Sequence, residues 1–236
     1  MDPLEKLPQL LECDTPETWN TTLLEITKDF GFDQIAFWSK PNKISRREAT
    51  FVKSTYPDEW LATYDKSKLH AVDPTILHCR KNMLPLAWTP KTFKGKKQKE
   101  FYGQACDYGL RSGITYPSHR MSGGFGVLTF ATGDIREADP HIEVMASLSL
   151  IRDFAFASSA KFFKNTQPNE LHLTPRELEI LQWVLAGKSS WETGKILRVA
   201  ESTINFHANN AMDECGVHTR REAALIALQA GLITLG

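Results

Sequence analysis

The sequence predicts an α+β protein: an N-terminal α/β/α sandwich with an antiparallel sheet, followed by an all-α helix-turn-helix domain. Segments rich in aromatic and β-branched residues, typical of strands, lie only in the first part of the chain and do not alternate one for one with helices. In the last part, helix-start signals follow one another at short intervals with no strand pattern between them. A polar stretch with Pro168 separates the two parts. We therefore expect domains over residues 1–164 and 171–236, joined by a linker over 165–170.

Length and composition place the chain among globular proteins. Its 236 residues are 42% hydrophobic and 24% charged, which fits a soluble protein with a core of its own. No apolar run approaches the roughly 18 residues of a membrane-spanning helix, and the acidic N-terminus lacks the positive charge of a signal peptide. The four cysteines share no metal-ligand spacing. We expect free thiols, no metal or cofactor, and a cytoplasmic protein.

Glycines and prolines set the expected element boundaries in the N-terminal domain. Gly31 ends an amphipathic run, while Pro57 and Pro74 stand at first helical turns, where a missing N–H costs no hydrogen bond. Five lysines between Lys91 and Lys99 lead into a further helix, and a solvated helix face is their simplest interpretation. Helices are expected at residues 3–13, 16–30, 57–64, 74–79, up to 108, and 137–163. Strands are expected at residues 32–38, 49–56, 113–118 and 124–132.

The C-terminal domain begins three of its helices with the same S/T-x-x-E capping box. In this box the cap hydroxyl and the carboxylate three residues later satisfy backbone N–H groups reciprocally. Gly187 and Gly231 stand just past apolar helical runs, where a left-handed residue ends a helix. Short helices with tight turns indicate a helix-turn-helix rather than a coiled coil. The three boxes are Thr174/Glu177, Ser189/Glu192 and Thr219/Glu222.

The segment from Glu201 to Glu214 is the helix expected to contact DNA. On a helical wheel its apolar residues form one stripe toward the core, and the opposite face carries short amides and hydroxyls suited to base edges and phosphates. An ordinary solvated helix face is the alternative interpretation. The core stripe consists of Ile204, Ala208, Ala211, Met212 and Cys215. The expected DNA contacts, which include two preceding lysines, are Lys188, Lys195, Ser202, Thr203, Asn205, Phe206, Asn209 and Asn210.

Net charge alone does not favour DNA binding. The chain carries 28 basic and 28 acidic residues, and from Glu170 to the end six basic residues stand against eight acidic ones. Binding must then depend on local clusters of cations, because counterion release scales with the number of phosphates contacted. We therefore expect two DNA-binding domains to act together.

One acid, Asp73, stands in a part of the chain that is unusually rich in aromatic residues. If buried, its carboxylate needs hydrogen-bond partners. Its place before Pro74 suits the N-cap of the following helix. The other interpretation is a ligand pocket, mostly apolar with a few convergent polar groups. The residues alone leave both open.

The C-terminal motifs resemble the DNA-binding domain of LuxR-type regulators. The resemblance rests on residues 173–183, 186–189 and 203–207, with Glu177, Leu181 and Gly187 at the best-marked positions. Gly187-Lys188-Ser189 also resembles the end of a phosphate-binding P-loop. Position 182, however, is Gln where that motif needs Gly, and no strand pattern precedes it, so a nucleotide site is not expected.

The N-terminal domain resembles the autoinducer-binding domain of the same family, most closely that of the LasR-like receptors. The residues that carry this resemblance include Tyr56-Pro57-x-x-Trp60, Asp73-Pro74 and Gly113. It implies that Trp60 donates to a lactone carbonyl, that Asp73 accepts from an acyl amide N–H, and that Tyr56 and Thr129 donate to the amide carbonyl. The implied ligand is an N-acyl-homoserine lactone of medium to long chain. The implied binding set is Tyr56, Trp60, Tyr64, Asp73, Thr75, Trp88, Phe101, Leu110, Thr115 and Thr129.

Some residues depart from the family pattern. Trp38 replaces a smaller residue of LasR-like proteins, and Leu61 replaces an arginine. The length of the ligand's acyl chain and the preference for a 3-oxo group therefore stay open. Ala200 replaces a serine cap of the recognition helix, a loss of about 1 kcal/mol. Gly194 is expected to weaken the preceding helix by about 1 kcal/mol relative to alanine. The pair Asp213-Glu214 replaces basic residues, which is unfavourable for phosphate contacts.

These features predict a transcription regulator and not an enzyme. The expected partners are an acyl-homoserine lactone, a two-fold-symmetric site on double-stranded DNA, a second copy of the chain through helices 137–163 and 220–230, and RNA polymerase if the protein is an activator; no membrane partner is expected. Alternatives are an orphan or antagonist receptor with weak DNA binding, or a regulator of a non-lactone signal. A response regulator would need an acidic cluster at the strand ends of a parallel α/β domain, which the non-alternating strand pattern does not predict. A lactone-cleaving enzyme would need a His-x-His-x-Asp or Gly-x-Ser-x-Gly motif, and the sequence has neither motif.

Overall fold

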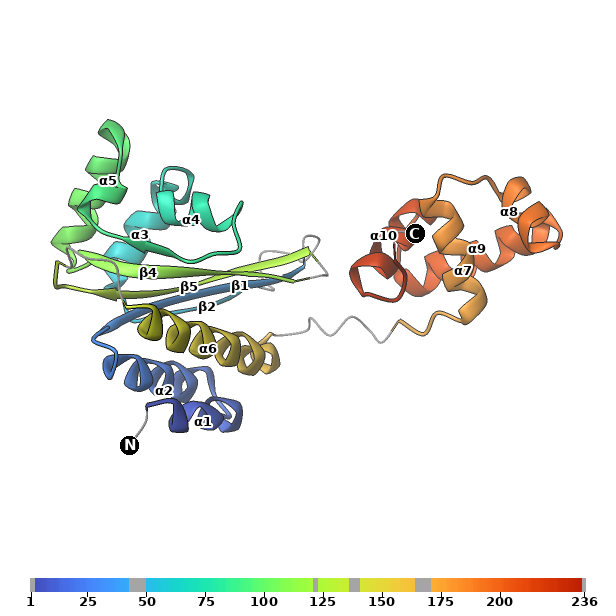
Figure 1. Cartoon of the computed structure of the whole chain (residues 1–236). Coiled ribbons are helices and arrows are strands. Elements are labelled where there is room, and N and C mark those ends of the chain that lie inside the picture. Colours follow the sequence, from blue (N-terminus) through green and yellow to red (C-terminus); the bar gives the residue numbers. More distant parts are fainter. Residues whose placement is uncertain (1–2, 43–49, 121–122, 136–140, 164–170, 235–236) are drawn as a thin grey trace. The chain divides into compact units, whose positions relative to one another are not determined.

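A computed structural model describes residues 3–42, 50–120, 123–135, 141–163 and 171–234 (Figure 1). The chain forms two compact units, the first made mainly of residues before Asn165 and the second mainly of residues from Asn165 onward. The predicted linker at 165–170 lies outside the described residues. Each unit is considered by itself below.

A five-stranded antiparallel sheet is the middle layer of the first unit, with the strand order β2-β1-β5-β4-β3. Strands β4 and β5 pair from Ser112↔Thr132 to His119↔Phe125. The four predicted strands are confirmed, while β3 was not predicted because three residues are too few to show a period of two. The strands are β1 (Gln34–Asn42), β2 (Phe51–Ser54), β3 (Leu86–Trp88), β4 (Ser112–His119) and β5 (Gly123–Thr132).

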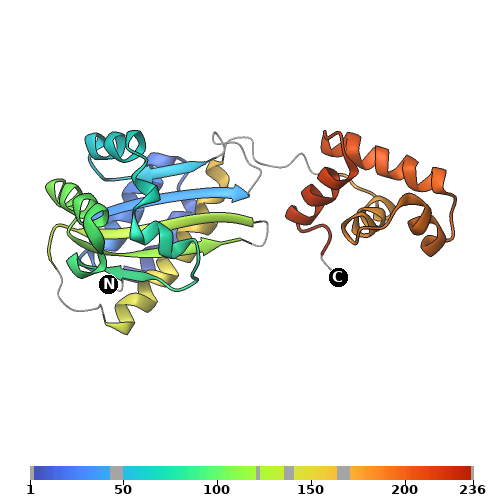
Figure 2. The ribbon, with the colours of Figure 1, turned by 90° about the horizontal axis from the view of Figure 1, so that it is seen from above.

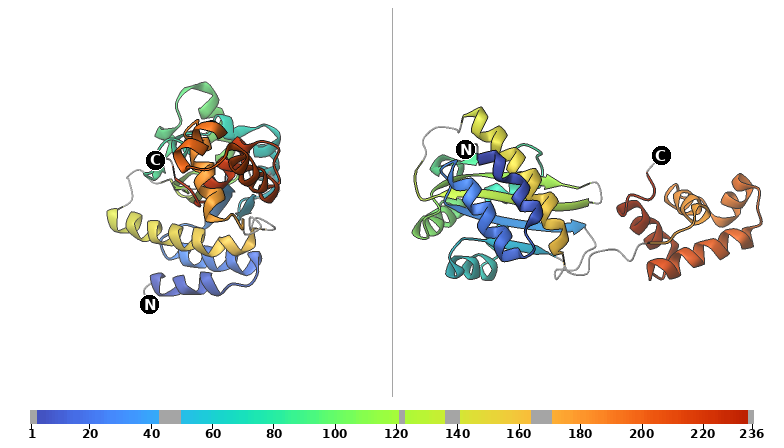
Figure 3. Two further views of the ribbon diagram at one scale, coloured as in Figure 1. Left: turned by 90° about the vertical axis from the view of Figure 1, so that its right-hand side faces the viewer. Right: turned by 90° about the horizontal axis from the view of Figure 1, so that it is seen from below.

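Helices cover both faces of this sheet, which confirms the predicted α/β/α sandwich. Figures 1 and 2 show α3, α4 and α5 over one face, and Figure 3 shows α1, α2 and α6 across the other. The first group is α3 (Asp58–Lys66), α4 (Pro74–Cys79) and α5 (Gly95–Asp107). The second is α1 (Leu7–Glu12), α2 (Pro16–Lys28) and α6 (Ile142–Ser158).

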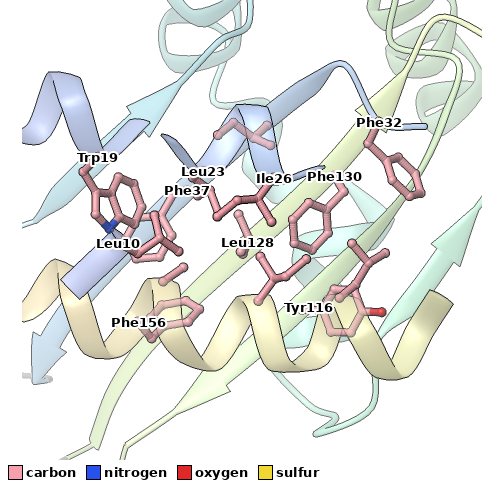
Figure 4. Packing of buried hydrophobic residues seen from close by; sticks show 14 of the residues in the cluster. Leu10, Trp19, Leu23, Ile26, Phe32, Phe37, Tyr116, Leu128, Phe130 and Phe156 are labelled. Atoms are coloured by element: carbon pink, nitrogen blue, oxygen red, sulfur yellow. The ribbon is translucent and has the colours of Figure 1, made fainter. Parts of the chain in front are cut away.

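The α1/α2/α6 face of the sheet holds the main apolar core (Figure 4). Trp19 of α2 is fully buried, and its ring centroid lies 5.0 Å from that of Phe37 on β1. Its indole N–H donates to Ser158 Oγ at 2.8 Å, so the one polar atom of this large side chain is satisfied. Burial of this aromatic cluster removes a large apolar surface from water and stabilises the first unit.

Alternation along the strands separates two environments. On β4, Ile114 and Tyr116 pack into the core just described, whereas Thr115 points to the opposite face. That opposite face, under α3, α4 and α5, carries a second apolar cluster that includes Trp60, Trp88 and Phe101. Consecutive residues of one strand therefore serve different faces.

Two helix predictions in the first unit need correction at their ends. The helix expected over residues 3–13 begins as a 3-10 turn, Pro3–Lys6, before α1. The helix expected over 137–163 is α-helical only over Ile142–Ser158 and tightens to a 3-10 turn over Ser159–Phe162. Residues 136–140 lie outside the described residues. Tighter hydrogen bonding at helix ends is common because terminal carbonyls and amides lack helical partners.

The second unit is all-helical, and its three predicted capping boxes are confirmed. Helix α9 has Ala200 at its N-cap without a side-chain hydrogen bond and ends at Gly216 with φ 64°. Gly187 and Gly231, the predicted stops, have φ of 78° and 73°. The helices are α7 (Pro175–Leu185), α8 (Ser190–Leu197), α9 (Glu201–Cys215) and α10 (Arg220–Gln229).

The expectation for Gly194 was wrong. A Cβ at this position would lie 2.8 Å from the carbonyl oxygen of Val199, closer than real side chains come. The Val199 N–H also donates to the Gly194 carbonyl at 2.9 Å. The glycine therefore permits the tight turn between α8 and α9, and alanine would strain this turn rather than strengthen α8.

Candidate functional site

Asp73 performs the predicted cap and leaves its second oxygen for other contacts. Its Oδ1 accepts hydrogen bonds from the backbone N–H and the hydroxyl of Thr75, both at 2.8 Å, at the start of α4. Its Oδ2 accepts from the Tyr64 hydroxyl of α3 at 2.9 Å. The cap thus fixes the carboxylate and aims one oxygen at α3. The two interpretations of Asp73 left open by the sequence are compatible.

Burial dominates the electrostatics of this carboxylate. Asp73 is only 6% exposed, and desolvation raises its pKa although the hydrogen bonds from Thr75 and Tyr64 oppose that rise. Burial, and then the nearby Asp73 charge, raise the pKa of Tyr64 well above its usual range, so this phenol stays a proton donor. An acceptor held in an apolar setting is a strong partner for an amide N–H.

A second polar chain crosses the same face of the sheet. The Trp88 indole N–H of β3 donates to Thr115 Oγ1 of β4 at 3.2 Å, and this hydroxyl lies 3.0 Å from Thr129 Oγ1 of β5. Trp88 pairs with Gly113, where a Cβ would meet the indole ring at 2.6 Å. Only glycine leaves room for the indole ring at this position of β4. These three side chains form a line across three neighbouring strands.

Aromatic rings surround the two polar groups. The Trp60 ring centroid lies 5.9 Å from that of Tyr64, 5.8 Å from that of Phe101 and 5.5 Å from that of Tyr108. Trp60 is 2% exposed, and Phe101 and Leu110 are also buried. Rings at such spacings form one continuous apolar wall.

Two donors on this face are left without partners within the part of the chain that the structure describes: the Tyr56 hydroxyl and the Trp60 indole N–H. Tyr56 is half-buried. Desolvation of its hydroxyl and, to a smaller extent, the negative charge of Asp73 raise its pKa far above the usual range. Neither atom is among the fully buried side-chain atoms of the described residues that lack a partner, so both donors border open space. Both groups are therefore available to a polar ligand beside Asp73.

The structure brings the ten predicted ligand-binding residues to one face of the first unit. The predicted binding set did not include Phe93 and Tyr108, which join the aromatic wall from the two ends of α5. It also omitted Cys79, whose thiol donates to the Thr115 carbonyl at 3.9 Å and has its pKa raised to about 12 by burial. The local sequence around Phe93, Tyr108 and Cys79 does not indicate these contacts, because the residues that they contact include some that are distant in the sequence.

In the second unit, α9 divides into the two faces predicted from its sequence. Ile204, Ala208 and Ala211 are buried. The opposite face carries exposed Ser202, Phe206, Asn209 and Asn210, with Thr203 half-buried. Lys188 and Lys195 are exposed just before it. This surface has the amides, hydroxyls and cations that DNA contacts use.

Asn205 differs from its neighbours because its side-chain oxygen is used inside the domain. It accepts from the Ser190 hydroxyl of α8 at 2.7 Å and from the Arg220 guanidinium of α10 at 3.4 Å. Arg220 also donates to the Ser190 hydroxyl. This three-residue contact ties α8, α9 and α10 together and fixes the turn before the recognition helix.

Glu214 also has a partner inside the second unit. Its carboxylate accepts from the His172 backbone N–H at 2.9 Å, which joins the end of α9 to the segment that precedes α7. A second unpredicted feature is Trp191 on α8, which is 59% exposed with the Lys195 ammonium 5.6 Å from its ring centroid. The four-residue spacing of this pair is the helical signal that would have found it.

Metal chemistry has no support in the described ranges, where no group of three or more His, Cys, Asp or Glu side chains is placed to hold an ion. Among those same residues, no helix is long and apolar enough to cross a membrane.

Comparison with known families identifies the protein family to which the two units belong. The family model described as "Autoinducer binding domain" matches residues 15–159, and the model described as "Bacterial regulatory proteins, luxR family" matches residues 171–227. The chain belongs to the LuxR family. It is a transcription regulator with an autoinducer-binding domain and a helix-turn-helix DNA-binding domain, and not an enzyme. The match of residues 15–159 also excludes the receiver domain of a response regulator.

Individual relatives agree with this assignment. The transcriptional activator protein AnoR of Acinetobacter nosocomialis is 31% identical over 89% of this chain and 92% of its own length. The transcriptional activator protein AhyR of Aeromonas hydrophila is 29% identical over 97% of this chain and 92% of its own. In fold, the chain is similar to SdiA crystallised with octanoyl-rac-glycerol, with a TM-score of 0.79, 23% identity, and coverage of 98% and 95%.

Proposed function

We propose that this LuxR-family regulator binds an N-acyl-homoserine lactone of medium to long chain in its first unit and, as a homodimer, a two-fold-symmetric site on double-stranded DNA. The observation that carries the proposal is the set of polar groups around Asp73. A buried carboxylate oxygen suits an amide N–H, and the free donors of Tyr56 and Trp60 suit the two carbonyls of such a ligand. The resemblance to LasR-like receptors supports the same ligand class.

In this proposal Asp73 accepts from the acyl amide, Trp60 donates to the lactone carbonyl, and Tyr56 and Thr129 donate to the amide carbonyl. The Thr129 hydroxyl oxygen lies 3.0 Å from that of Thr115. If the Thr115 hydroxyl donates to Thr129, the Thr129 hydroxyl proton is left to donate to a ligand carbonyl. The aromatic wall excludes water from these hydrogen bonds and strengthens them. Binding to the folded state alone stabilises the fold by mass action.

Exposed apolar residues support the homodimer. On α6, Ile142 is 77% and Leu150 is 42% exposed, two turns apart on one side of the helix. On α10, Leu225 is 38% exposed. A second copy that covers these side chains would remove them from water, and a self-complementary interface would place two recognition helices for a symmetric site.

The proposed location in the cell follows from the proposed DNA partner. A regulator of this class acts in the cytoplasm, where it meets the DNA. The relatives AnoR and AhyR are described as transcriptional activators, which supports activation through contact with RNA polymerase.

The test is the melting temperature of the full chain against a panel of lactones, with Asp73→Asn as the matched variant. Asparagine keeps an oxygen for Thr75 but presents an NH2 group where the ligand amide needs an acceptor. We expect a chain-length-dependent rise in the wild type and no rise in the variant. A flat response in folded wild-type protein would sink the lactone proposal and leave a regulator of another signal. Stabilisation without binding to DNA selected from a random duplex pool would indicate an antagonist receptor.

The same pair of proteins predicts a pH dependence. Because burial raises the pKa of Asp73 above its ordinary value of 3.8, the folded state holds this proton more tightly than the unfolded chain. Stability of the ligand-free wild type must therefore fall, relative to Asp73→Asn, as the pH rises through the raised pKa. Denaturant unfolding of both proteins, from below pH 3.8 to above the raised pKa, measures the difference between their free energies of unfolding. If that difference did not change with pH, Asp73 would not be a buried, desolvated carboxylate.

A further inference from the structure

We propose that Trp38 and Phe125 form the end wall of the acyl-chain site and set its length limit at about eight to ten carbons. This inference rests on the proposed lactone function and makes it more specific. It concerns the same face of the sheet as Asp73, farther along the strands.

Strand alternation places both rings on that face. Phe37, the neighbour of Trp38, packs into the α1/α2/α6 core, so Trp38 points to the other side of β1. The ring centroids of Trp38 and Phe125 lie 5.7 Å apart. Phe125 in turn lies 5.2 Å from His119, whose Nε2 lies 2.9 Å from the Cys79 carbonyl at the end of α4. The aromatic pair therefore stands under the α4 side of the sheet.

The position of β5 beside β1 gives the distance from the polar groups to this pair. A Cβ on Gly126 of β5 would lie 2.8 Å from the Trp38 backbone carbonyl, so β5 runs beside β1 at this level. Thr129, which would hold the amide carbonyl, is three residues farther along β5. At about 3.4 Å per residue, Thr129 lies roughly 10 Å along β5 from the level of Gly126, beside Trp38, and roughly 14 Å from Phe125.

That distance converts into carbon atoms. Carbon–carbon bonds of about 1.52 Å at angles of about 111° advance roughly 1.25 Å per carbon, so roughly 10 Å accommodates about eight carbons beyond the amide. The wall between Thr129 and the pair is apolar, with Val127 and Cys79 buried. A hydrocarbon chain suits this surface, and each methylene that it buries adds about fourfold in affinity.

Beyond Trp38 the sheet opens to solvent. Val52, the partner of Trp38 across β1 and β2, is 54% exposed. A longer chain in the wild type would have to displace two packed rings. Removal of the Trp38 ring would instead open a path across β1 toward Val52 on β2. The length limit therefore depends on this one large side chain.

The experiment measures dissociation constants of the full chain for unsubstituted acyl-homoserine lactones from about four to about fourteen carbons. In the wild type, affinity should rise about fourfold per carbon to about eight to ten carbons and then stop rising or fall. In Trp38→Ala the rise should continue for about two to four more carbons. Trp38→Phe should keep the wild-type limit, and Trp38→Leu provides a milder truncation if the alanine variant does not fold.

Val52→Ala is the matched control, because it lies on the same face beyond the pair and should leave the limit unchanged. An identical length dependence in wild type, Trp38→Leu and Trp38→Ala would overturn the end wall while the lactone function stands. Absence of binding at every length in folded wild-type protein would overturn both.

Discussion

Strand β4 and helix α9 divide their residues in the same way but with different consequences. Each turns one face to an apolar core and the other to a partner, with a period of two in β4 and 3.6 in α9. In β4 both faces are buried: Ile114 on the core face and Thr115 on the opposite face, proposed to bind the ligand, are each fully inaccessible. In α9 the second face is open to solvent. The residues proposed to bind the ligand are thus part of the core of the first unit, whereas those proposed to contact DNA are not part of the core of the second.

The largest expected effect lies in β4, where neighbouring residues on opposite faces should both cost stability. Ile114→Ala removes a core side chain and should lower the free energy of unfolding by about 2–5 kcal/mol. Thr115→Val keeps the shape but leaves the buried Trp88 N–H without its acceptor, which costs about 1–3 kcal/mol. Denaturant unfolding of the full chain, followed by a signal from the first unit, measures both.

The ligand response separates the two substitutions. Ile114→Ala should still show a lactone-dependent rise in melting temperature, from a lower starting value. Thr115→Val should show a reduced rise, because the Thr129 hydroxyl loses its neighbour in the polar line. An unchanged rise in Thr115→Val would overturn the proposed role of the Thr115–Thr129 pair in binding the ligand.

A smaller effect is expected at the start of α9. Ala200 occupies the N-cap with extended backbone and no side-chain hydrogen bond, so Ala200→Ser should add a missing cap and about 1 kcal/mol of stability to the second unit. Helix content followed on thermal unfolding measures it. The lactone-dependent shift of the first unit should not change. Ala200→Gly, which lacks a hydroxyl, is the control that separates capping from backbone conformation.

Local rules predicted more of the second unit than of the first. The capping boxes and Gly187 act within one helical turn, so the sequence alone placed the starts and ends of these helices. In the first unit, local chemistry predicted the cap of α4 by Asp73 but not the contact of its other oxygen with Tyr64, and it missed β3 entirely. Such features depend on packing between residues far apart in the chain, which no local pattern encodes.

Within α9 the same limit applies to single residues. The helical period correctly assigned Ile204 to the core and Asn209 to the surface. It placed Asn205 with the DNA-contacting residues, yet the oxygen of Asn205 is held by Ser190 and Arg220 from two other helices. Position on a helical wheel states which way a side chain points but not which neighbour it meets.

The smallest effect on stability is expected on the open face of α9. Asn209 is exposed, so Asn209→Ala should change the free energy of unfolding by no more than about 0.5 kcal/mol, toward greater stability because alanine is the better helix former. If the side chain reads a base edge, affinity for DNA sites selected by the wild type should fall by about 1–3 kcal/mol and selectivity at one position should relax.

The matched contrast for Asn209 is Ile204→Ala on the buried face of the same helix, where a loss of about 2–5 kcal/mol in stability is expected. A uniform loss of affinity across DNA sequences in Asn209→Ala, with a shallower salt dependence, would assign this residue to phosphate contact instead. Unchanged affinity would place the DNA surface elsewhere on the second unit. A stability loss comparable to that of Ile204→Ala would contradict the difference drawn between α9 and β4, because it would make the open face of the helix part of the core as well.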